Sequence, residues 1–321
     1  MGPPQPPAFS GQPANGSKTE TRSSLQALST SGKASILAIA SKAAKSTNED
    51  ACTLFAGDRV SLVAIADGLG TSVDCHLAAR LATDAIHAAA LRLEQSGEQV
   101  RIDTVEDLWK SVGEAIPAFY AGHRDLYDNA PSPLETTLLF VLDLPGYYVV
   151  SYLGNGSVWL IRGDYWQFLP RRWPWCLTDV LIGHTSLSAT GRDVLFGTVG
   201  PTGLTSAPTT LALSKDPTHG EILLITTDGI SSRDHGRVGE DGNGKLWQEV
   251  DPHLKTILGT HLLEFLGRAS PSVSGHELLA QSLGNFLNET DFDDDATLAM
   301  LVSSPVLRYF RQHNETRDGG T

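Results

Sequence analysis

Cysteine is scarce in this sequence. The three cysteines, Cys52, Cys75 and Cys176, are far apart and form no CxxC pair. They give no disulfide framework, which is typical of a protein in a reducing compartment. Long apolar runs are also missing, since none approaches the roughly 20 residues of a membrane span, and the N-terminus has no apolar signal region. We therefore expect a cytoplasmic protein without a membrane partner.

Positive charge is in short supply as well. The chain has 24 Lys and Arg against 37 Asp and Glu, for a formal net charge of −13. Binding to nucleic acid requires clustered basic side chains, so we expect no nucleic-acid partner. The long-range field also opposes a phosphorylated substrate, which would need local cations at its binding site. Apolar residues make up 40% of the 321 residues, enough for a sizeable core.

Composition divides the chain into three parts. Residues 1–31 are dominated by Pro, Gly, Ser, Gln and Thr, and we expect them to be disordered because they bury little apolar surface. Residues 32–304 form the expected folded domain. Residues 305–321 are polar and charged, and we expect a loose tail.

Apolar periodicity predicts strands in blocks and helices in pairs. The helices are predicted at 73–94, 105–125, 252–267 and 274–288. The strands are predicted at 35–41, 51–56, 60–66, 136–142, 147–152, 157–162, 165–169, 209–213, 221–226 and 297–302. Residues of about 171–207 are irregular. Strands and helices do not alternate as in a doubly wound fold. The pattern predicts an α+β, four-layer αββα sandwich of two mainly antiparallel sheets flanked by helix pairs.

Four aspartates stand at the ends of predicted strands. Asp50 begins one strand, Asp67 and Asp228 each end a strand before Gly, and Asp294 precedes the last strand. Each signal alone is more often a turn or a solvated loop. Together they match a centre for hard divalent cations, which prefer oxygen ligands on rigid backbone. Two such ions about 3.5–4 Å apart can share a water, lower its pKa and clamp a phosphate ester.

Six motifs occur in a characteristic order: NEDA, IADGLG, ETTLLF, YLGNGSVWLIRGD, ITTDGI and DDAT. In this order the chain resembles the protein phosphatase 2C family of metal-dependent phosphatases, in a divergent bacterial-type branch. The resemblance extends from Ile36 to Val302. It implies a β-sandwich flanked by helices, two Mn²⁺ or Mg²⁺ ions, and hydrolysis of phosphoserine or phosphothreonine in proteins.

The resemblance also implies roles for particular residues. Glu49 corresponds to an acid that orients the attacking water, and residues of about 171–207 correspond to a flap over the substrate. Thr136 and Thr137 correspond to a structural strand start. The implied metal ligands are Asp50, Asp67, the carbonyl of Gly68, Asp228 and Asp294.

Three departures from the family pattern bear on activity. Lys45 stands where the family has a phosphate-binding Arg, and it keeps the charge without the bidentate fork. Asn155 replaces an Asp that helps to hold a third metal, so a third ion there would lose a charged ligand. Asp295 replaces an Asn, and the extra carboxylate either supports Asp294 or competes with it.

We therefore hypothesise a protein serine/threonine phosphatase that acts by in-line attack of metal-activated water, with Lys45 steadying the phosphate. Its partners would be a phosphoprotein substrate, such as a Ser/Thr kinase or the targets of one, and we expect a monomer. The alternative is a catalytically weak, phosphatase-like module that binds phosphoproteins or a partner kinase. A third hypothesis is a metal hydrolase of small phosphoesters.

Overall fold

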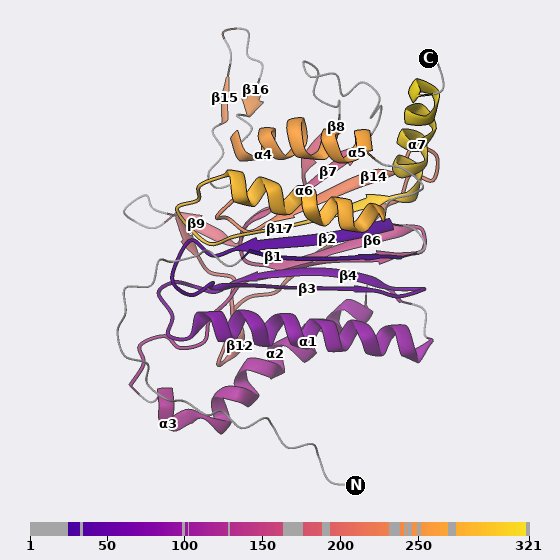
Figure 1. The fold of residues 1–321 in the computed structure, drawn as a ribbon. Helices are drawn as coiled ribbons and strands as arrows, with labels where there is room; N and C mark the ends of the chain where they lie inside the picture. The colour runs from indigo at the N-terminus through magenta and orange to yellow at the C-terminus, as the bar shows by residue number, and fades with distance from the viewer. Residues whose placement is uncertain are drawn as a thin grey trace, which may run out of the picture.

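A computed structural model defines the fold. It describes residues 25–32, 35–97, 100–101, 103–127, 129–162, 176–187, 193–230, 238–240, 242, 246–248, 252–268 and 274–318. Two large antiparallel sheets lie face to face, with helices on both outer faces (Figure 1). The predicted four-layer αββα sandwich is therefore confirmed.

One large sheet has six strands, in the order β1-β2-β17-β14-β7-β8. Its central strands are apolar on both faces because one face meets helices and the other meets the second sheet. The strands are β1 (Leu25–Ser31), β2 (Ser35–Lys42), β7 (Ser157–Arg162), β8 (Cys176–Asp179), β14 (Glu221–Thr226) and β17 (Ala296–Ser303).

The second large sheet has five strands, in the order β13-β6-β5-β4-β3. Each strand pairs antiparallel with its neighbours. The strands are β3 (Asp50–Ala56), β4 (Ser61–Asp67), β5 (Leu138–Leu144), β6 (Tyr147–Leu153) and β13 (Thr209–Ser214).

Helices cover the outer face of each sheet. The long helices α1 (Cys75–Ser96) and α2 (Thr104–Gly122) lie on the five-stranded sheet, and α3 (Arg124–Tyr127) follows them (Figure 1). On the six-stranded sheet lie α4 (Pro252–Thr256), the π-helix η3 (Ile257–Leu262), α5 (Leu263–Arg268) and α6 (Gly275–Glu289). The buried face of α1 carries many alanines at helical spacing, which lets the helix approach the sheet closely.

Three apolar cores correspond to the three layer boundaries. One lies between the six-stranded sheet and its helices, and a second between the five-stranded sheet and α1 and α2. The third lies between the sheets and contains Leu37, Val63, Val150, Leu223 and Leu301. Burial of apolar area at these boundaries is the main favourable term in folding, so the sandwich depends on both sheets being present.

Short strands occupy part of the region predicted to be irregular. They are β9 (Thr185–Leu187), β10 (Asp193–Leu195), β11 (Val199–Gly200) and β12 (Gly203–Leu204). A further hairpin joins β15 (Val238–Glu240) to β16 (Leu246–Gln248). The strand predicted at 165–169 lies outside the described residues.

Two expectations about the chain ends are wrong. Leu25–Ser31, expected to be disordered, forms β1 and pairs along its whole length with β2. The residues from 305 onward, expected to be loose, contribute to α7 (Ser304–Asp318), whose first turn buries Val306 and Leu307 against the core. β1 is ordered by pairing with the next strand, β2, and by packing of Leu25 against the core, whereas α7 is ordered by the burial of Val306 and Leu307.

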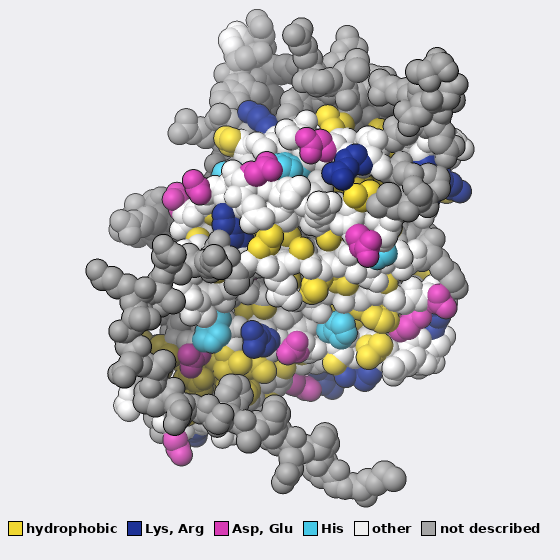
Figure 2. Space-filling model, viewed as in Figure 1, with side chains coloured by type: hydrophobic (Ala, Val, Ile, Leu, Met, Phe, Trp, Pro, Cys, Tyr) yellow, Lys and Arg dark blue, Asp and Glu magenta, His cyan; other side chains and the backbone are white. Residues whose placement is uncertain are grey.

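The surface carries charges of both signs. On the face shown in Figure 2, the Asp and Glu side chains are scattered among Lys, Arg and His rather than gathered in one patch. None of the helices in the described part of the chain has the length and hydropathy needed to cross a membrane.

The core between the sheets gives a first prediction. Leu223 is fully buried there, whereas the side chain of Leu126 on α3 is 74% exposed. Leu223→Ala should lower the free energy of unfolding by about 2–5 kcal/mol, and Leu126→Ala by less than about 0.5 kcal/mol. Urea denaturation followed by tryptophan fluorescence would measure both. Equal effects of the two substitutions would contradict the assigned core.

Candidate metal centre

Strand pairing brings the four predicted aspartates to one edge of the sandwich. Asp50 at the start of β3 lies directly opposite Asp67 at the end of β4. Asp228 follows the end of β14, and Asp294 precedes β17, the strand that pairs antiparallel with β14. Each sheet therefore contributes two carboxylates, and the centre lies where the edges of the two sheets meet.

The electrostatics of Asp50 reflect this crowding. Its side chain is buried, and loss of hydration raises its pKa to about 7. Hydrogen bonds from Thr297 and Thr227 act in the opposite direction, while the negative charges of Asp295 and Asp228 add to the increase in pKa. Thr227 Oγ1 donates to Asp50 Oδ2 over 3.0 Å.

Asp67 shows the same effect more strongly. Burial raises its pKa well above the ordinary value, and the nearby charges of Asp50, Asp228 and Asp294 raise it further. Asp67 interacts with the other three carboxylates, so the four side chains form one cluster. The strand ends therefore place the four aspartates within electrostatic range of one another, and their joint role as metal ligands stays a prediction.

The donor set fits divalent cations. Asp50 Oδ1 is buried and has no hydrogen-bond partner among the described residues, which is costly for a carboxylate oxygen in a protein interior. Several clustered carboxylates without counter-charge are also mutually repulsive. A hard cation would satisfy the buried oxygen and remove the repulsion, since such ions prefer carboxylate ligands.

Gly68 lets the chain pass close to the start of α1. A Cβ at this position would lie 2.7 Å from the backbone of Cys75, so a larger residue would force the loop to move. Its N–H donates to the carbonyl of Glu49 over 3.1 Å. This packing places the Gly68 backbone beside Asp67, while its role as a carbonyl ligand stays a prediction.

Lys45 provides positive charge at the rim of the centre. Its Nζ lies 2.5 Å from Glu49 Oε2 and 2.7 Å from Asp294 Oδ1. Burial lowers the pKa of Lys45, but the hydrogen bonds to Asp294 and Glu49 have a larger combined effect. The pKa of Lys45 is therefore above its ordinary value. The ammonium group is therefore retained at neutral pH, next to two of the predicted site residues.

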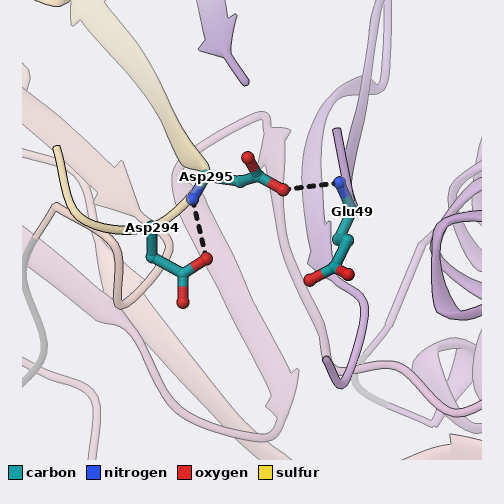
Figure 3. Close-up of side chains that lie close together, drawn as sticks. All are labelled: Glu49, Asp294 and Asp295. Atoms are coloured by element: carbon teal, nitrogen blue, oxygen red, sulfur yellow. Dashed lines mark hydrogen bonds between the residues drawn. The ribbon is translucent and has the colours of Figure 1, made fainter. Parts of the chain in front are cut away.

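Carboxylate oxygens of Glu49, Asp294 and Asp295 lie within 4.8 Å of one another (Figure 3). The three side chains differ in the groups that hydrogen-bond to their oxygens. Asp295 is buried, and its oxygens accept the backbone N–H groups of Ala44, Lys45 and Glu49. Asp295 therefore supports the backbone next to the site instead of competing with Asp294 for a cation.

Asn155 contacts the cluster directly. Its Nδ2 donates to Asp228 Oδ2 over 2.7 Å, so the amide orients this carboxylate. Its predicted role toward a third ion stays a prediction.

Two hydrogen bonds join His184 to Gly154, the residue before Asn155. The backbone N–H of His184 donates to the Gly154 carbonyl, and the N–H of Gly154 donates to His184 Nδ1. This pair ties the segment predicted as a flap to the Asn155 loop.

Some supporting residues had no recognised signal in the sequence. Thr227 and Thr297 join β14 to β17 beside the site, because Thr297 N donates to Thr227 Oγ1 over 3.0 Å. Thr136 and Thr137, which were predicted to be structural, bind the backbone of Asp67. Thr227 directly follows the buried strand β14, and this position could have indicated a structural role. Its partner, Thr297, could not be identified from the sequence, because that requires the register of β14 and β17.

Comparison with known proteins gives a partial family match and a shared fold. Residues 40–170 match the family model described as protein phosphatase 2C. A bacterial serine phosphatase aligns with a TM-score of 0.51 over 88% of this chain and 98% of its own, at 15% identity. The serine/threonine phosphatase Stp1 from Staphylococcus aureus aligns with a TM-score of 0.51 over 90% of this chain and 99% of its own, at 14% identity. No curated protein matches the chain.

The two sheets and their covering helices form a sandwich with the aspartates at one edge. The family match confirms the resemblance to the protein phosphatase 2C family that the motifs predicted. At such low identity the two solved structures show the fold alone.

The pKa of Asp50 predicts how the stability of the metal-free protein depends on pH. The folded-state pKa of about 7 exceeds the ordinary value of 3.8, so the folded state binds more protons than the unfolded state between these values. Stability should therefore fall as pH rises from about 4 to 7, by roughly 2–4 kcal/mol. Urea denaturation in EDTA across this range would measure it.

Asp50→Asn is the control for this pH effect. The variant lacks one titrating carboxylate and should show a smaller decline in stability than the wild type, while the raised pKa of Asp67 maintains the remainder of the decline. Adding Mn²⁺ at pH 8 should stabilise the wild type and raise the Tm of the variant much less. A wild-type protein whose stability in EDTA does not decline between pH 4 and 7 would contradict the assigned electrostatics.

Proposed function

We propose that the protein is a metal-dependent phosphatase that hydrolyses phosphoserine and phosphothreonine in proteins. The observation that carries this proposal is the electrostatic interaction of Asp67 with Asp50, Asp228 and Asp294, together with a buried Asp50 Oδ1 that has no hydrogen-bond partner among the described residues. The match to the phosphatase 2C family and the shared fold support the same reaction class.

The four aspartates and the Gly68 carbonyl would hold two Mn²⁺ or Mg²⁺ ions. When bound, such ions supply a water of lowered pKa and neutralise charge on the phosphate. The carboxylates are held by strand ends and by Thr227, so their geometry is set before any ligand arrives. Asn155 would keep Asp228 in the required orientation.

Glu49 and Lys45 would act on the substrate side. The Glu49 carboxylate faces the rim of the centre and can accept a proton or a hydrogen bond from the attacking water. Lys45 carries the positive charge that attracts the phosphate, which offsets the acidic net charge of the chain. In-line attack by water requires no side-chain nucleophile, so no covalent intermediate is formed.

The alternative of a catalytically weak binding module has one observation in its favour. The Lys45 ammonium is already paired with Glu49 and Asp294, and these contacts must loosen before it can bind phosphate. A cation bound at Asp294 would weaken that pairing. A binding module would have no need of the clustered aspartates, whose mutual repulsion is costly without metal. We therefore favour the enzyme.

The first test is turnover of p-nitrophenyl phosphate with and without Mn²⁺. The wild type should require Mn²⁺, and Asp228→Asn should lower kcat/KM by about 100-fold or more, since it removes a ligand charge. Comparison with a phosphothreonine peptide would distinguish a protein phosphatase from a hydrolase of small esters. A folded, Mn²⁺-loaded wild type that turns over neither compound would exclude the phosphatase and leave the binding module.

Lys45→Arg tests the phosphate-binding role. A guanidinium can bind phosphate through two parallel N–H groups, so KM should fall by about threefold while kcat changes little. Steady-state kinetics with the phosphopeptide at saturating Mn²⁺ would measure both constants. An unchanged or higher KM would contradict the role of Lys45.

A further inference from the structure

We propose that Asp295 is a positioning residue that holds the segment carrying Lys45 and Glu49 in place at the rim of the metal centre. This inference rests on the proposed function and deepens it. It assigns a task to the position at which the chain departs from the family by carrying a carboxylate in place of an amide.

Both Asp295 oxygens are engaged by one short segment of chain. Oδ1 accepts the N–H groups of Ala44 and Lys45 at 2.7 and 3.1 Å. Oδ2 accepts the N–H of Glu49 at 2.7 Å (Figure 3). Hydrogen bonds to a carboxylate are stronger than neutral ones. One buried side chain therefore fixes both ends of the stretch from residue 44 to residue 49.

This segment has no regular structure of its own. It links the end of β2 at Lys42 to the start of β3 at Asp50, and residues 43–49 belong to neither helix nor strand. Its N–H groups therefore lack the partners that a helix or sheet would provide. Asp295 replaces those partners, although it lies about 250 positions further along the chain.

Asp295 is itself held firmly. Its N–H donates to Asp294 Oδ1 over 2.8 Å, and β17 begins at the next residue. Its carbonyl packs so closely against Gly229 that a Cβ at Gly229 would lie 2.0 Å from that oxygen. Asp295 thus links three parts of the site: the Asp228–Gly229 turn, Asp294 and the Lys45 segment.

The chemistry requires a carboxylate at this position. The three described groups that hydrogen-bond to the Asp295 side chain are all N–H donors, so both of its oxygens accept. An asparagine has one acceptor oxygen, and its NH₂ group would face a donor. The fixed backbone matters because a lysine ammonium is a point charge on a flexible stem. The position of the Lys45 charge therefore depends on how well its backbone is held.

The test compares Asp295→Asn with a matched control, Glu94→Gln. Glu94, near the end of α1, also accepts three backbone N–H groups, those of Asp58, Arg59 and Val60. These residues form the turn between β3 and β4, at the opposite end of β3 from Asp50. The two variants remove the same kind of interaction, but only Asp295 supports the segment of Lys45.

Kinetics at saturating Mn²⁺ separate positioning from general destabilisation. With p-nitrophenyl phosphate, Asp295→Asn should raise KM about tenfold and lower kcat by less than about threefold. The inhibition constant of inorganic phosphate should rise by a similar factor. Glu94→Gln should leave both constants within about twofold of wild type. An unchanged KM in Asp295→Asn, or an equal rise in both variants, would overturn the proposal.

Amide hydrogen exchange tests the anchor without relying on catalysis. In the wild type, the N–H groups of Ala44, Lys45 and Glu49 should be protected to a degree comparable with strand amides. Asp295→Asn should accelerate their exchange at least about tenfold and leave residues 58–60 unchanged, and Glu94→Gln should do the reverse. Exchange of these wild-type groups at the rate of an exposed loop would overturn the proposal even if Asp295→Asn fails to fold. If the wild type showed these protected amides but no turnover, the anchoring role of Asp295 would stand and the proposed phosphatase activity would be rejected.

Discussion

The direct pairing of Asp50 with Asp67 across β3 and β4 places two like charges at one edge of the sandwich, and the second sheet adds Asp228 and Asp294 to the same edge. The resulting repulsion is the constraint around which the site is built. Burial raises the pKa values of Asp50 and Asp67, and the repulsion raises them further, so the cluster favours positive charge nearby. The rest of the local structure, including strand register, threonine hydroxyls and the close turn at Gly68, serves to keep these carboxylates together against that repulsion.

The fold was predictable because its strongest elements are also the most apolar. The predicted strands at 35–41, 221–226 and 297–302 correspond to β2, β14 and β17, whose residues are almost all buried. The segments that form β1 and α7 could not be predicted, because their order depends on partners elsewhere. β1 is polar and half-exposed, and it is held by hydrogen bonds to β2. Local composition does not show whether such pairing and packing will form.

The position of the four aspartates at the strand ends was predictable for a related reason. An aspartate at the end of a buried strand has a fixed position once the strands pair, so the order of the motifs in the sequence implied their convergence. The contacts of Asp295 were not predictable. Its partners are backbone N–H groups about 250 positions away, and every residue except proline has such a group. Sequence patterns indicate which side chains are available, whereas the acceptors of backbone groups depend on three-dimensional proximity.

The link between His184 and Gly154 has a mechanical consequence. Two hydrogen bonds join these residues, and the next residue, Asn155, holds the Asp228 carboxylate. The orientation of the Asp228 carboxylate therefore depends, through the Gly154 peptide unit and the Asn155 amide, on how the buried His184 is packed.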